Sequence, residues 1–168
     1  MSDAPLAKIA DPNELGILAR RRIEAAIIAP IYAELRAEIG EQRAKGLIAR
    51  AIRQAAIEAG KDFAAKTPGG VNLQTFQDIQ HLWTQDDALR IEVLRANSDV
   101  FEFNVRRCRY AESYKAMGLG EIGPLLSCNR DGAFCEGYDP RIKLTRTQTI
   151  MEGASHCDFR YAFEPESG

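Results

Sequence analysis

The first part of the chain carries apolar residues at helical spacing. Asp11-Pro12 is typical of a helix start, because aspartate caps free backbone N–H groups and proline is tolerated in the first turn. From residue 14 to residue 39, apolar side chains recur mostly every three or four positions, with charged residues largely between them. Pro30 can kink this helix or divide it in two. Gly40 predicts a break before a second helix, and Gly60 predicts that the second helix weakens or ends.

The second predicted helix has a face of small and apolar residues that suits close packing against another helix. This face consists of Leu47, Ile48, Ala51, Ile52, Ala55 and Ala56. The segment KTPGGVN, at residues 66–72, is the strongest internal break, because Pro-Gly-Gly favours a turn or loop. We therefore expect one domain over residues 1–168, with a helical N-terminal half at 1–66 and a mixed half at 73–164.

Beyond this break the apolar residues change their period. Alternation at 89–93 and 100–105, with the turn Ala-Asn-Ser-Asp between them, predicts an antiparallel hairpin. The runs IKLTRTQTIM, at 142–151, and CDFRYAF, at 157–163, predict a second hairpin. The whole pattern predicts an α+β fold, in which N-terminal helices pack on a small antiparallel sheet of about four strands.

A helix that begins near Pro124 is predicted between the two hairpins. Cys128 and Asp131 are three residues apart and Cys128 and Cys135 are seven apart, so all three side chains can share one helical face. This inserted helix therefore carries a Cys-x-x-Asp motif. We expect the helix and the sheet to form the pocket together.

Composition and charge exclude several function classes. The net charge of −2 and the isoelectric point near 5.8 give no electrostatic basis for binding nucleic acid. No secretory signal pattern and no apolar run of about 18 residues is present, so we expect no membrane span and a cytoplasmic location. In that compartment the cysteines are expected to be reduced thiols, and the lack of a C-x2-C pair argues against a structural zinc knuckle.

Reactive side chains gather between Leu126 and Phe163. Cys128 is the best candidate nucleophile, because it lies near a predicted helix start and is followed by Arg130, and both features favour a thiolate. Asp131, one turn away, can orient a water, a substrate amine or a histidine. The alternative is a set of buried thiols near a few surface charges.

Two further side chains in this stretch have candidate roles. His156 can supply an acid or a base, although it and Cys157 point to opposite faces of a regular strand. Arg146 can bind a substrate carboxylate through a bidentate pair, and its alternative is a solvated or ion-paired strand arginine.

The same residues permit a metal site. Cys108, Cys128 and Cys157, with Asp131 or His156 as a fourth ligand, can form a mixed site from three elements of the chain. The local spacing gives only weak support for such a site. We therefore expect no cofactor, with a divalent metal as the open alternative.

Three ordered segments resemble a known family. FNVRRCRYAESYKAMGLGEIGPLLSCNRD, LTRTQTIMEG and HCDFRY closely resemble the bacterial L-2-amino-thiazoline-4-carboxylic acid hydrolases, over about residues 101–163 and more weakly before them. The family pattern places a cysteine at Cys108, a Cys-x-x-Asp motif at Cys128 and Asp131, and Gly-x-x-x-Cys-Asp-Phe at 153–159. Cys135 and His156 are not assigned by that pattern.

The resemblance implies a hydrolase that opens a small cyclic substrate with C–N and C–S bonds, such as 2-amino-thiazoline-4-carboxylate, to a carbamoyl-cysteine. The implied roles are Cys128 as nucleophile and Asp131 as the group that holds the exocyclic amine or the water. Direct thiolate attack and a water route both stay open. The remaining expected site residues are Cys157, Asp158 and His156 in catalysis, and Arg146, Asn104, Cys108 and Thr147 in substrate binding.

The alternative from another class is a non-catalytic module that binds a small molecule or a metal through its cysteines. A low thiol pKa at Cys128 would favour the enzyme, and an unreactive thiol would favour the module. In either case we expect a homo-oligomer, because the apolar faces of the N-terminal helices can bury against a second subunit.

Overall fold

A computed structural model describes residues 15–165, and it begins with two long helices. Helix α1 spans Ile17–Ile39 and helix α2 spans Glu41–Ala65. The break between them is at Gly40, which has a φ of 82°. Pro30 lies inside α1 without dividing it, and the predicted helix start at Asp11-Pro12 lies outside the described residues.

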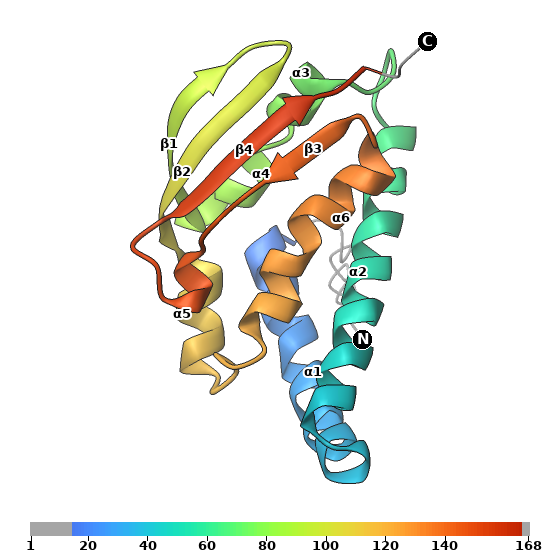
Figure 1. Cartoon of the computed structure of the whole chain (residues 1–168), viewed down its shortest axis with the longest axis vertical. Helices are drawn as coiled ribbons and strands as arrows, with labels where there is room; N and C mark the ends of the chain where they lie inside the picture. Colours follow the sequence, from blue (N-terminus) through green and yellow to red (C-terminus); the bar gives the residue numbers. More distant parts are fainter. Residues whose placement is uncertain (1–14, 166–168) are drawn as a thin grey trace, which may run out of the picture.

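Gly60 does not end α2, which was one of the two outcomes that the sequence predicted for this glycine. The helix continues to Ala65, and a Cβ at Gly60 would overlap the Phe134 carbonyl oxygen and lie 2.7 Å from the Tyr138 nitrogen. Phe134 and Tyr138 belong to helix α6, Asn129–Tyr138, which runs beside α2 (Figure 1). The glycine is therefore a point of close helix packing, where any side chain would separate the two backbones.

Four antiparallel strands form one sheet with the order β1-β2-β4-β3. The strands are β1 Leu89–Ala96, β2 Val100–Cys108, β3 Ile142–Thr145 and β4 Cys157–Phe163. Figure 1 shows the long helices packed together with α6 on one side of this sheet. Alternate residues of the two central strands, such as the paired Phe103 and Phe159, are buried beneath it. The predicted α+β fold is confirmed.

The second hairpin is shorter than predicted. Strand β3 ends at Thr145, and the chain then leaves the sheet before a single 3₁₀ turn, η4, at Ile150–Glu152. The Asp158 carboxylate accepts hydrogen bonds from the backbone N–H groups of Thr147 and Gln148, each at 2.9 Å. These bonds replace strand pairing, so the strand predicted over 142–151 is correct only as far as Thr145.

Short helices connect the long helices to the sheet. They are α3 Leu73–Asp78, α4 His81–Thr84, the 3₁₀ turn η2 Gln85–Asp87, and α5 Arg109–Ala116. The predicted helix from Pro124 starts as a π-helical turn, η3 Pro124–Cys128, and continues as α6. None of the helices in residues 15–165 is both long and apolar enough to cross a membrane.

Candidate functional site

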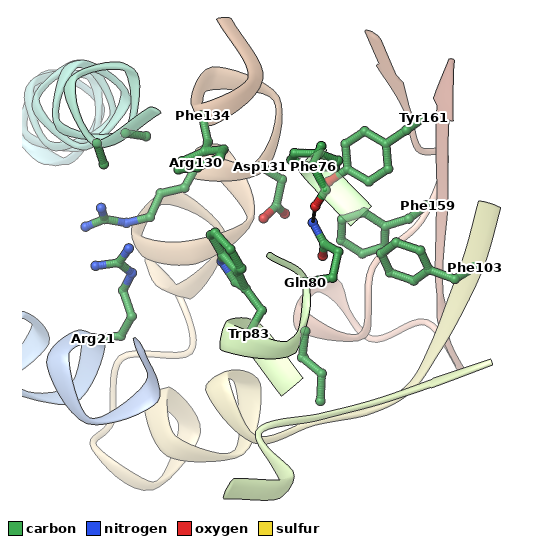
Figure 2. A pocket seen from close by; sticks show the side chains of 13 residues that line it. Arg21, Phe76, Gln80, Trp83, Phe103, Arg130, Asp131, Phe134, Phe159 and Tyr161 are labelled. Atoms are coloured by element: carbon green, nitrogen blue, oxygen red, sulfur yellow. Dashed lines mark hydrogen bonds between the residues drawn. The ribbon is translucent and has the colours of Figure 1, made fainter. Parts of the chain in front are cut away.

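Two adjoining cavities lie between α6 and the inner face of the sheet. Each has a volume of about 50 Å³, enough for a few water molecules or part of a small ring. Their shared wall consists of Arg21, Trp83, Leu89, Arg130, Asp131 and Phe159. The first cavity is otherwise lined largely by aromatic rings (Figure 2), and the second adds thiols. This enclosed, mainly apolar space suits a small molecule.

The carboxylate of Asp131 lines both cavities. Its Oδ2 atom accepts a hydrogen bond from Nη1 of Arg146 at 2.5 Å. Its other oxygen has no hydrogen-bond partner within residues 15–165, and Figure 2 shows the carboxylate directed into the space between Trp83 and Gln80. One oxygen is thus fixed by a cation, and the other is available to a ligand.

Burial raises the pKa of the Asp131 carboxyl above its ordinary value, and the charge of Arg146 offsets only part of this effect. Although 23% of the side-chain surface remains open, that surface lines the cavities. A carboxyl whose pKa is shifted towards neutrality can both take up and return a proton.

The Arg146 guanidinium is already ion-paired within the protein. Besides Asp131, its guanidinium donates to the Cys128 carbonyl oxygen at 3.1 Å and lies 4.9 Å from the centre of the Phe159 ring. The ion-paired alternative for this arginine therefore describes the structure. Arg146 orients Asp131, and because it also lines the second cavity, its predicted contact with a substrate carboxylate stays a prediction.

Three of the four cysteines line the second cavity. Cys128 lies there with Cys108 and Cys157, although these residues come from three different elements. The Cys108 sulfur accepts a hydrogen bond from the Ala111 N–H at 3.4 Å, and the Cys157 sulfur accepts one from the Ile150 N–H at 3.2 Å.

Cys135 does not join the other three cysteines. It is 1% exposed and belongs to the aromatic cluster between α6 and the sheet. The prediction that it shares a functional face with Cys128 and Asp131 is not supported, because its position on α6 turns it towards that cluster.

The surroundings of Cys128 do not favour the expected thiolate, and its role as nucleophile stays a prediction. Burial, together with the nearby charge of Asp131, raises the pKa of the Cys128 thiol. Burial likewise raises the pKa of Cys108 to about 11 and the pKa of Cys157 above its ordinary value. Arg130 does not help, because its guanidinium donates to the Leu126 carbonyl oxygen and to Glu24.

The other predicted site residues lie away from the cavities. His156 is close to Ser155 and Gln148 in the turn before β4. Asn104 is buried and accepts a hydrogen bond from Arg160 at 3.0 Å. The structure therefore does not bring these side chains to the cysteines.

The Asp158 side chain holds the loop that follows β3 through Thr147 and Gln148. The Asp158 carboxylate accepts bonds from the backbone N–H groups of Thr147 and Gln148 and from the Thr147 hydroxyl, the last at 2.5 Å. Burial opposes ionisation, but these bonds outweigh it and hold the pKa of Asp158 at about 2, compared with 3.8 ordinarily. This arrangement indicates a structural role.

We expect Asp158→Asn to lower the free energy of unfolding by about 1 to 2 kcal/mol at pH 7, because it weakens charge-assisted hydrogen bonds. Since the folded-state pKa is depressed, the contribution is present above about pH 4 and disappears as the pH falls towards 2. Urea unfolding of both proteins at pH 7 and pH 3 measures this. An equal difference at both pH values would contradict the prediction.

No group of three or more His, Cys, Asp or Glu side chains within residues 15–165 is placed to hold a metal ion. The mixed site of three cysteines that the sequence permits is therefore not formed by the described side chains. The expectation that the protein needs no cofactor stays a prediction.

Sequence reasoning missed several residues of the cavities. Arg21 was assigned to the charged positions of the first helix, yet its side chain is only 15% exposed. Gln80, Trp83 and Tyr161 also line the first cavity (Figure 2). The Tyr161 hydroxyl has no hydrogen-bond partner among the described residues. The signal that could have found them is the single tryptophan of the sequence, which stands among several polar residues at 73–86.

These features define an α+β domain with two adjoining inner cavities that share the Asp131 carboxylate. Residues 20–161 match the model of the L-2-amino-thiazoline-4-carboxylic acid hydrolase family. The chain belongs to this family, as the resemblance of three segments between residues 101 and 163 predicted. Comparison with curated proteins gives no match.

Solved structures with a similar fold include the phenol-responsive sensory domain of the transcription activator PoxR, with phenol. It is 14% identical, with a TM-score of 0.53, and the match covers 83% of this chain and 74% of that chain. A second is subunit 3 of a trafficking protein particle complex from Naegleria fowleri, covalently bound to palmitic acid. It is 9% identical, with a TM-score of 0.47, and the match covers 86% of this chain and 97% of that chain. At 14% identity, the likeness to the PoxR domain concerns the fold alone.

Proposed function

We propose that the protein is a cytoplasmic hydrolase that opens a small cyclic amidine-like substrate, such as 2-amino-thiazoline-4-carboxylate, to N-carbamoyl-cysteine. The observation that carries the proposal is the Asp131 carboxylate, which has one oxygen held by Arg146 and the other open to an enclosed cavity. Membership of the hydrolase family supports it.

The chemistry requires one water molecule and one group that moves a proton. Carbon C2 of the ring lies between nitrogen and sulfur and is electrophilic once the ring nitrogen is protonated. Asp131 accepts a proton while the water oxygen bonds to C2, and the tetrahedral centre then breaks its C2–S bond. The proton passes from Asp131 to the departing sulfur, and the remaining hydroxyl proton is released to solvent as the urea carbonyl forms. The product is a urea on the cysteine nitrogen together with a free thiol.

A water route agrees better with the thiols than the predicted attack by Cys128. Burial and Asp131 raise the pKa of Cys128, so at neutral pH this side chain is a neutral thiol. We therefore assign Cys128 to the wall of the cavity, where it contributes shape. The thiolate route remains the competing mechanism for the same reaction.

We expect Cys128→Ser to retain kcat/KM within about tenfold, whereas loss of a covalent nucleophile usually costs about 10⁴-fold or more. Steady-state turnover of the two purified proteins measures the difference, with iodoacetamide labelling at pH 7 as a second readout. Slow labelling of Cys128 is expected. A variant without detectable turnover, together with rapid labelling of the wild-type residue, would restore Cys128 as the nucleophile.

The first experiment on function is hydrolysis of 2-amino-thiazoline-4-carboxylate by the purified protein. The release of free thiol measures the reaction. The metal content of the sample is analysed, and the assay is repeated after chelation. Turnover that survives chelation supports the proposal. Absence of turnover in both states would refute the substrate assignment.

A second candidate is a non-catalytic module that binds a small molecule. The aromatic cavity and the raised pKa of the Cys128 thiol favour it, and the PoxR sensory domain, which has a similar fold, was solved with phenol. Stoichiometric binding of the thiazoline, with the compound recovered unchanged after prolonged incubation, would identify this function.

Self-association is also part of the proposal. Ile23, Ile27 and Ile31 follow one another at four-residue intervals on α1, and each is at least 47% exposed. Such an apolar stripe is typical of a helix that contacts another subunit. The homo-oligomer stays a prediction.

A further inference from the structure

An outer groove lies between α1 and α2, and some of the side chains that line it also line both inner cavities. The groove has a volume of about 410 Å³. Arg21, Trp83 and Arg130 line it and line both cavities as well. These three residues therefore form the partition between the groove and the space around Asp131.

The two arginines of this partition share a single acidic partner. Nη1 of Arg21 donates to both carboxylate oxygens of Glu24, at 2.8 and 3.0 Å, and Nη2 of Arg130 donates to one of them at 2.9 Å. Two guanidinium groups and one carboxylate leave a net charge of +1. By contrast, Arg146 and Asp131 form a balanced pair nearby.

The excess charge lies in a poorly solvated place. The side chains of Arg21 and Arg130 are 15% and 12% exposed. Burial, and then the charge of Arg21, lowers the pKa of Arg130 to about 10. A buried cation without its own counterion is costly, and an anion bound beside it would remove that cost.

Several hydrogen-bond donors of this pair are unused. Within residues 15–165, Nε and Nη2 of Arg21 and Nη1 of Arg130 have no acceptor. Guanidinium groups bind carboxylates through such paired N–H donors. One bound monocarboxylate would both fill these donors and neutralise the site.

We propose that Arg21 and Arg130 form a binding site for the carboxylate group of a small organic acid that enters through the groove between α1 and α2. Figure 2 shows both guanidinium groups on one side of Trp83 and the Asp131 carboxylate on the other. A ligand that spans Trp83 can thus place its carboxylate at the arginines and a basic nitrogen at Asp131. This assignment of the substrate's carboxylate rests on the proposed function, but binding of the anion does not require turnover.

Trp83 provides a direct readout, because it is the only tryptophan of the chain and lies in the partition. The probes are 2-aminothiazole-4-carboxylate, whose aromatic ring resists hydrolysis, and 2-aminothiazole, which lacks the carboxylate. Tryptophan fluorescence titrations give both dissociation constants. Wild-type protein is expected to bind the carboxylate at least about tenfold more tightly than the neutral ring.

Arg21→Gln is expected to weaken binding of the carboxylate by about tenfold and to leave binding of 2-aminothiazole unchanged. Arg22→Gln is the matched control, because Arg22 is a neighbouring exposed arginine on the same helix. Glu24→Gln should tighten binding of the carboxylate, since it removes the competing anion. A gain of affinity cannot result from misfolding.

Equal affinity of wild-type protein for the two probes would overturn the proposal, as would an equal loss of both in Arg21→Gln. Carboxylate-selective binding without hydrolysis of the thiazoline would leave the anion site standing and refute the hydrolase. Hydrolysis of the thiazoline with an unchanged KM in Arg21→Gln would support the hydrolase and refute the anion site.

Discussion

Gly137→Ala is expected to lower the free energy of unfolding by about 3 kcal/mol or more. A Cβ at this position would overlap the Ile57 carbonyl oxygen and lie 2.8 Å from the carbonyl carbon. These atoms belong to the backbone of α2, which cannot turn aside as a side chain can. The methyl group must therefore push α6 away from α2, and this movement opens the packing that holds both helices.

Gly132→Ala is the matched control for this prediction, because Gly132 lies on the same helix and a Cβ there has no neighbour within 4 Å. Alanine favours a helix over glycine by about 1 kcal/mol, so the control should be neutral or more stable. Thermal and urea unfolding of both variants measure the difference. Similar stability of Gly137→Ala and wild-type protein would show that α2 and α6 are not in backbone contact.

Asp131→Asn is expected to lower kcat/KM for the thiazoline by about 100- to 10,000-fold. The amide has the size of the carboxyl but cannot accept a proton from water, and it cannot form the ion pair with Arg146. Asp158→Asn is the control, since Asp158 lies outside both cavities and holds a loop. The control should retain activity per folded molecule.

The pH profile gives an independent readout for Asp131. A base must be ionised to act, so activity is lost as the pH falls through the pKa of Asp131. Because burial raises that pKa, the acidic limb of kcat/KM should lie above the ordinary aspartate range. Nearly full activity of Asp131→Asn, or an acidic limb near pH 4 in the wild-type protein, would contradict the role of Asp131 as the base.

The local pattern predicted the elements whose stability depends on neighbouring residues in the chain. The long helices followed from the helical spacing of apolar residues, and β1 and β2 from alternation around a polar turn. Cys128 and Asp131 line the same cavity, as their spacing of three residues predicted. The family was also recognisable from the segments around them.

Predictions failed where a distant partner decides the role of a residue. Gly60 has the local features of a helix end, yet it is the place where α6 approaches α2. The strand predicted to continue beyond Thr145 stops, because Asp158 binds the backbone N–H groups of the next turn. Local propensity contains no information on either partner.

The sequence by itself determined the α+β class, the family, and the presence of a Cys-x-x-Asp motif on an inserted helix, because these depend on periodicity and on short motifs. Only the tertiary structure decided how the pKa values of Cys128 and Asp131 are shifted. Burial under the sheet raises the pKa of the Cys128 thiol and the pKa of the Asp131 carboxyl. Likewise, Arg21 and Arg130 lie 109 positions apart in sequence, and only helix packing brings them to one shared glutamate.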